Sequence, residues 1–230
     1  MRQIIPNVYT FDNLIMGRVY LIDDGGELSL IDTGLALAGD RILKQITDSG
    51  RQIAQVKHIL ITHAHLDHVG SLDKLKAATG AQVIASAEDA PIVEGKQDPP
   101  LPDRKTLPFP HNLIPVSAKA ASKTPVDRIV ADGDTLPGGL QVIATPGHSY
   151  GHVSYYHPAL KLLFTGDVLF HMTGMGLPLR PATPDMEMNK RSIGKLCAFD
   201  IEIACFGHGQ PILRGAGDQI RAFARKLGVA

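Results

Sequence analysis

Residues 63–68 are His63-Ala64-His65-Leu66-Asp67-His68, and this stretch decides how the rest of the chain is interpreted. It places three histidines and one carboxylate within six residues, and both groups are ligands that divalent metals bind in proteins. The residues before it, Val56–Thr62, predict a buried strand, and a helical pattern begins after it at Ser71. We therefore expect a dense set of metal ligands on a turn between a strand and a helix, where functional residues are commonly placed.

Three further candidate ligands stand at the ends of strand-like runs in the second half of the chain. They are His148 after residues 140–145, Asp167 after residues 161–165 and His208 after residues 201–206. A glycine directly precedes each of them, and a residue without Cβ lets the backbone turn sharply there. Four strand ends that terminate in His or Asp are hard to explain by core packing alone, so the pattern predicts a metal site.

In this order the motifs resemble those of the metallo-β-lactamase superfamily. They are HAHLDH at 63–68, TPGH ending at His148, TGD ending at Asp167 and GHG around His208. An opening hairpin over residues 19–31, followed by Asp32-Thr33-Gly34, extends the resemblance over almost the whole chain. The resemblance implies an α/β fold, a four-layer αββα sandwich with metals at one edge of its two sheets.

Carried over residue by residue, the resemblance implies a site for two divalent metal ions. His63, His65 and His148 would hold one ion, and Asp67, His68 and His208 would hold the second. Asp167 would bridge the two ions, and it is the expected catalytic residue together with Asp67. We expect zinc, with iron, manganese, cobalt and nickel as alternatives.

A centre of this kind favours hydrolysis of an acyl bond. Metal binding lowers the pKa of water to about 7, which produces a nucleophile at neutral pH. The positive charge that remains polarises a carbonyl and stabilises the oxyanion of a tetrahedral intermediate. A serine or cysteine nucleophile has no supporting motif in this chain, so no covalent enzyme intermediate is expected.

Two more polar residues are candidates for orienting the ligands. Ligating histidines usually donate their second ring N–H to a carboxylate or carbonyl, and Asp32 at the end of a strand suits that role. The alternative for Asp32 is a carboxylate that hydrogen-bonds its own turn. His152, four residues after His148, is expected to support the site from outside the ligand set, with a purely structural histidine as the alternative.

Two segments are expected to form the substrate wall. Residues 91–125 hold eight of the sixteen prolines, which predicts an extended excursion that packs over the substrate side. Residues 170–179 follow Asp167 directly, and their methionines and glycines favour an adaptable apolar surface. The expected wall residues are Phe170, His171, Met172 and Met175, and the alternative is ordinary core or a mobile loop.

The composition is that of one globular domain spanning residues 1–230. Lys plus Arg equals Asp plus Glu at 23 each, so no basic surplus indicates a nucleic-acid partner. No run approaches the length of a membrane span, and residues 1–6 lack the apolar core of a signal peptide, which makes the cytoplasm the expected location. The expected partner is a small molecule with an acyl bond, and a homodimer is left open.

The substrate preference rests on departures from the patterns of known branches. Lactonases of the superfamily often place a tyrosine where this chain has Phe170, which weakens that assignment. Glyoxalase-II enzymes carry a further C-terminal region and a basic residue in the loop after the bridging aspartate, and neither is evident here. We favour a lactone or carboxylic ester. The alternatives are a glyoxalase-II-like thioesterase, a persulfide dioxygenase with one iron on His63, His148 and Asp167, and a binding protein with a degenerate site.

Overall fold

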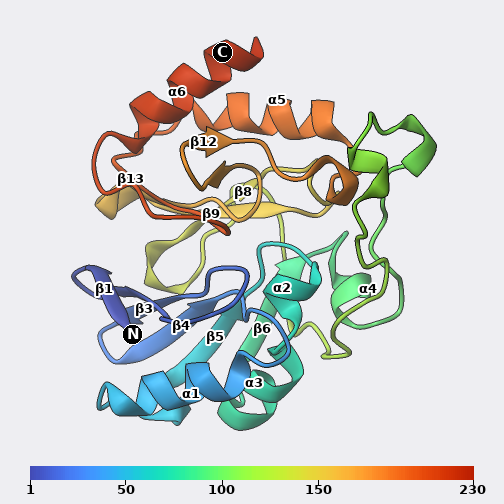
Figure 1. Ribbon diagram of the computed structural model, residues 1–230. Helices are drawn as coiled ribbons and strands as arrows, with labels where there is room; N and C mark the ends of the chain where they lie inside the picture. Colours follow the sequence, from blue (N-terminus) through green and yellow to red (C-terminus); the bar gives the residue numbers. More distant parts are fainter. The chain divides into compact units, whose positions relative to one another are not determined.

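The computed structural model describes residues 1–230, which divide into two compact units. The first unit consists of Met1–Asp98 and Ala120–Val130, and the second of Pro99–Lys119 and Ala131–Ala230 (Figure 1). The prediction of a single domain stays a prediction. None of the helices is both long enough and apolar enough to cross a lipid bilayer.

The first unit contains a seven-stranded sheet whose spatial order follows the sequence from β1 to β7. The first three strand pairs are antiparallel, and the pairs from β4 onward are parallel. Helices connect the parallel strands, as parallel neighbours require. The strands are β1 (Arg2–Ile5), β2 (Val8–Thr10), β3 (Tyr20–Asp24), β4 (Glu27–Ile31), β5 (Val56–Leu60), β6 (Gln82–Ser86) and β7 (Arg128–Val130).

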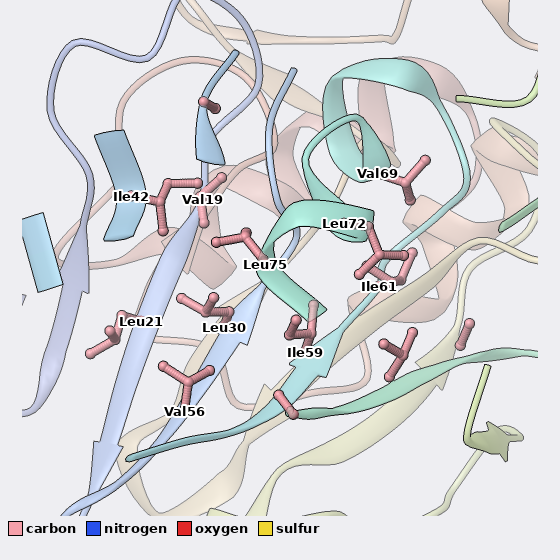
Figure 2. Packing of buried hydrophobic residues seen from close by; sticks show 14 of the residues in the cluster. Val19, Leu21, Leu30, Ile42, Val56, Ile59, Ile61, Val69, Leu72 and Leu75 are labelled. Carbon is pink, nitrogen blue, oxygen red and sulfur yellow. The ribbon is translucent and has the colours of Figure 1, made fainter. Parts of the chain in front are cut away.

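Two helices, α1 (Gly39–Asp48) and α3 (Leu72–Thr79), cover one face of this sheet. Their apolar side chains form one buried cluster with the strands. Figure 2 shows Ile42 of α1 beside Val19, and Leu75 of α3 near Leu30 and Ile59. The short helices α2 (Leu66–Val69) and α4 (Ala90–Val93) follow β5 and β6. Because parallel β4 and β5 pair up to Ile31 and Leu60, the residues that follow both strands emerge at the same sheet edge.

The second unit contains a four-stranded sheet in the order β13-β10-β9-β8. Helices α5 (Met186–Leu196) and α6 (Ala216–Leu227) bury Ile193, Leu196, Ile220 and Ala224 in its core. A separate two-stranded sheet joins β11 (Phe170–His171) to β12 (Met175–Gly176). The main strands are β8 (Gln141–Ala144), β9 (Val153–His157), β10 (Leu162–Phe164) and β13 (Ile203–Cys205).

The strand ends predicted to carry ligands are confirmed as strand ends, with small differences in length. The strand expected over Val56–Thr62 stops at Leu60, because the Thr62 N–H donates to the Asp32 carboxylate and not to a neighbouring strand. Residues 94–127 contain no strand or α-helix, and their regular structure is limited to the 3-10 turns η2 (Arg104–Thr106) and η3 (His111–Leu113). Residues 170–179, expected as part of the substrate wall, carry the short β11–β12 pair.

Candidate metal centre

The turn after β5 brings four of the predicted ligands together within the first unit. The ring centroids of His63 and His68 are 4.0 Å apart, and those of His63 and His65 are 4.7 Å apart. His68 Nε2 lies 3.7 Å from Asp67 Oδ2. The backbone of the turn is fixed from outside, because the Ala64 N–H donates to the carboxylate of buried Asp89 at 2.8 Å. Four ligand candidates therefore stand on one rigid turn.

Asp32 contacts this turn through both carboxylate oxygens. Its Oδ1 accepts the Thr62 N–H at 2.8 Å, and its Oδ2 accepts the Thr62 hydroxyl and lies 2.8 Å from His68 Nδ1. Asp32 is buried and has a φ of 62°, a left-handed conformation that a non-glycine residue adopts at some cost. It lies where an orienting carboxylate should lie, and its role in metal binding stays a prediction.

The hydrogen bonds around Asp32 determine which ring nitrogen carries the proton in two histidines. An ionised carboxylate only accepts, so His68 donates from Nδ1. The Thr62 hydroxyl gives its one hydrogen to Asp32, so it accepts from the Nδ1–H of His63 at 3.0 Å. Both rings therefore present the lone pair of Nε2. Sequence reasoning missed Thr62, because its residue type alone suits a strand.

In the second unit, two histidines meet one oxygen of Asp167. His148 Nε2 lies 3.4 Å from Asp167 Oδ2, and His208 Nε2 lies 3.2 Å from the same oxygen. Ligand atoms at the corners of a tetrahedral zinc site are about 3.3 Å apart for the usual bond lengths. Each of these two distances therefore suits a histidine and Asp167 that bind the same metal ion.

The loop of His148 is held by helix α5 and by a threonine. Gly147 has a φ of 132°, and a Cβ there would overlap the backbone of Asn189, whose side-chain amide donates to the Val168 carbonyl at 2.9 Å. Thr183 gives its hydroxyl hydrogen to Leu179, so it accepts from His148 Nδ1 at 3.0 Å. His148 Nε2 thus carries a lone pair as well. Thr183 and Asn189 lie far from His148 in sequence, and no motif marked them.

His152 lies behind Asp167 and differs from the ligand candidates. Its Nε2 accepts the backbone N–H of Asp167 at 2.9 Å, and its Nδ1 lies 2.8 Å from the Thr145 hydroxyl. Both ring nitrogens therefore have partners inside the second unit. The role of His152 as a support outside the ligand set stays a prediction.

The four expected wall residues have different environments. The Phe170 ring packs on the His208 ring with centroids 4.6 Å apart, and His171 Nδ1 lies 2.8 Å from the Gln210 carbonyl. Met175 packs against the apolar core of the second unit, whereas Met172 is 65% exposed. Phe170 is thus beside a ligand candidate, and Met175 contributes at least partly to the core.

An apolar cavity of about 340 Å³ in the first unit was not expected from the sequence. It adjoins the ligand turn, because Gly17 follows the lining residue Met16 and leaves no room for a Cβ beside the backbone carbonyl of Asp67. Two of its lining residues are largely exposed, Leu37 at 85% and Ile15 at 83%. The lining residues are Leu14, Ile15, Met16, Leu35, Ala36, Leu37, Ala38 and Arg41.

The donor set suits divalent metals. Three histidines, His63, His68 and His148, present Nε2 lone pairs because their Nδ1 atoms donate to oxygen, which is the usual arrangement of metal-bound imidazoles. Two carboxylates, Asp67 and Asp167, lie next to imidazole nitrogens. Nitrogen and oxygen ligands without thiolates favour zinc and its first-row neighbours.

Comparison with known proteins assigns the family. The model of the metallo-β-lactamase superfamily matches residues 13–208. The chain belongs to the metallo-β-lactamase superfamily. Its predicted α/β class is confirmed.

Individual relatives place the chain within the superfamily. A hydroxyacylglutathione hydrolase of Cereibacter sphaeroides is 33% identical over 195 residues, which is 82% of this chain and 61% of that relative. A probable metallo-hydrolase of Bacillus subtilis, YflN, is 30% identical over 80% of this chain and 75% of its own length. The structure of BJP-1, a subclass B3 metallo-β-lactamase of Bradyrhizobium japonicum, superposes with a TM-score of 0.72 at 27% identity, covering 98% of this chain and 89% of that one.

Proposed function

We propose that the protein is a binuclear metallohydrolase that cleaves a lactone or carboxylic ester with an apolar acyl chain. The observation that carries this proposal is the set of histidines whose Nδ1 atoms donate to Asp32, Thr62 and Thr183, because these bonds leave Nε2 ready for a metal. The proposed ligands are the seven implied by the superfamily motifs: His63, His65, Asp67, His68, His148, Asp167 and His208.

The bound ions would supply a hydroxide nucleophile and an electrophile for the carbonyl oxygen. The chain's own residues hold the ligands in place: Asp32 and Thr62 orient His68 and His63, and Thr183 orients His148. Phe170 beside His208 has no proton to give to a departing alkoxide. We therefore expect good leaving groups, as in activated esters and strained lactones, to react faster than amides.

The apolar cavity supports the acyl part of the proposal. Its volume of about 340 Å³ falls at the lower end of the range for small-molecule sites. Leu14, Ile15 and Met16 line it without a charge, and Arg41 is its one ionised lining residue. Such a cavity would accept an unbranched apolar chain of moderate length. The expected wall at Met172 and Met175 is the competing location for the same chain.

A substrate series tests the function and its location together. Lactones and esters of increasing acyl length should be hydrolysed with kcat/KM rising up to about fourfold per methylene until the cavity is filled. Leu37→Asp should flatten this dependence if the cavity holds the chain, and Met172→Asp should flatten it if the β11–β12 hairpin does. A length-independent rate in the unmodified enzyme would reject the apolar acyl group.

A thioesterase is the second candidate, favoured by the 33% identity to hydroxyacylglutathione hydrolase. The match covers 61% of that relative, so its substrate is a hypothesis for this chain. A hydroxyacyl thioester of glutathione included in the same series distinguishes the two. Faster turnover of the thioester than of every ester and lactone would favour this candidate.

A further inference from the structure

A line of buried hydrogen bonds leads from the core of the second unit to Asp167. It runs through Ser154, Thr145 and His152. Ser154 Oγ donates to the Thr165 carbonyl at 2.9 Å and lies 3.0 Å from Thr145 Oγ1. Thr145 Oγ1 lies 2.8 Å from His152 Nδ1, and His152 Nε2 accepts the Asp167 N–H at 2.9 Å. Ser154, Thr145 and His152 are at most 1% exposed, so bulk water does not compete for these bonds.

The direction of every bond in this line follows from its end points. Ser154 has one hydroxyl hydrogen and gives it to the Thr165 carbonyl, so its oxygen accepts from Thr145. Thr145 has then used its own hydrogen, so it must accept from the Nδ1–H of His152. At the other end, the Asp167 N–H needs an acceptor, which only an unprotonated Nε2 provides. Both ends select the same neutral tautomer of His152.

We propose that His152 is a positioning residue for Asp167, held as its Nδ1–H tautomer by Thr145 and Ser154. The opposite tautomer would point the Nε2–H at the Asp167 N–H across 2.9 Å, which is a repulsive contact of two donors. The bond fixes the backbone of Asp167 at the turn after β10, and its carboxylate then meets His148 and His208. The consequence for metal affinity rests on the proposed function, whereas the tautomer itself does not.

Nitrogen-15 NMR of the histidine rings tests the tautomer directly in the intact 230-residue chain. The signals of His152 are identified by their loss in His152→Gln. The proton should reside on Nδ1 in the unmodified protein. Ser154→Ala removes the acceptor of the Thr145 hydrogen, which then turns to Nδ1, so this variant should increase the Nε2–H form. A proton on Nε2 in the unmodified protein would overturn the proposal.

Two amide variants test the positioning role by zinc affinity, measured by competition with a chromophoric chelator. The carbonyl of His152→Gln reaches the place of Nε2 and still accepts the Asp167 N–H, whereas His152→Asn reaches only the place of Nδ1. The asparagine variant should lose about tenfold or more in zinc affinity relative to the glutamine variant. Equal affinities in two variants of equal thermal stability would contradict the positioning role.

Two matched threonine variants distinguish the loss of this line of hydrogen bonds from a general loss of core stability. Thr145→Val breaks the line, whereas Thr10→Val removes an equally buried hydroxyl that donates to Val19 in the first unit. Only Thr145→Val should weaken zinc binding. If the unmodified protein binds no zinc at all, the proposed function fails, and the NMR result still decides the tautomer.

Discussion

The Thr62 hydroxyl forms hydrogen bonds with both an acceptor, Asp32, and a donor, His63. It donates to Asp32 Oδ2 at 2.8 Å and accepts from His63 Nδ1 at 3.0 Å, so it links a carboxylate to an imidazole without a charge of its own. The Thr62 N–H meets the other oxygen of Asp32. Thr62 thus fixes the tautomer of one ligand candidate, His63, and the orientation of a carboxylate that contacts another, His68.

Thr62→Val should therefore weaken zinc binding although Thr62 is no ligand. We expect a loss of about 10- to 100-fold in zinc affinity, because His63 would lose the acceptor that holds its Nδ1–H. Thr62→Ser keeps the hydroxyl and should bind zinc nearly as well as the unmodified protein. Unchanged affinity in the valine variant would show that the hydroxyl does not orient His63.

Helix α3 carries an anchor for the segment that leads into β7. Asp73 in its first turn accepts from the Ser122 hydroxyl at 2.6 Å, from the Lys123 N–H at 3.1 Å and from the Thr124 hydroxyl. Partial burial would raise the pKa of Asp73, but these hydrogen bonds outweigh it and hold the pKa below its ordinary value. The folded state therefore binds this proton less readily than the unfolded chain.

The sign of this shift predicts a pH dependence for Asp73→Asn. Stabilisation by the carboxylate is fully present above the unfolded pKa of about 4 and is lost as the pH falls through the lower folded pKa. Near pH 7 the free energy of unfolding of the variant should be about 1–3 kcal/mol lower than that of the unmodified protein, and this difference should close in acid. Thermal unfolding at a series of pH values measures it. Asp48→Asn, in an exposed pair with Lys44, is the control and should change little. A gap of constant size down to pH 3 would contradict the assignment.

For the whole molecule, metal binding should increase the free energy of unfolding. A ligand that binds only the folded state stabilises it by about 2.7 kcal/mol at one hundred times its dissociation constant. Zinc should therefore raise the unfolding temperature of metal-free protein, and a chelator should reverse the change. Asp167→Ala should show little increase, because it removes the carboxylate that meets both His148 and His208. An equal increase in the variant would reject Asp167 as a ligand.

Features set by residues close together in the sequence could be predicted, whereas contacts between residues far apart in the sequence could not. The strand ends and the residues after them are local, so β5, β8, β10 and β13 and their following His or Asp residues were predicted. The supporting groups act over long separations, such as the 35 residues between His148 and Thr183, and no spacing rule connects them. The apolar cavity was missed for the same reason, because two separate loops and Arg41 of α1 build it.

The two loops that line the cavity carry none of the seven proposed ligands. Residues 14–16 and 35–38 can therefore vary by mutation while the ligand motifs remain intact. Under selection for a new substrate, this arrangement separates the evolution of specificity from that of the reaction. A library randomised at Leu14, Ile15, Met16 and Leu37 is accordingly a sound starting point for directed evolution, since most of its members should retain the metal chemistry while sampling new substrate preferences.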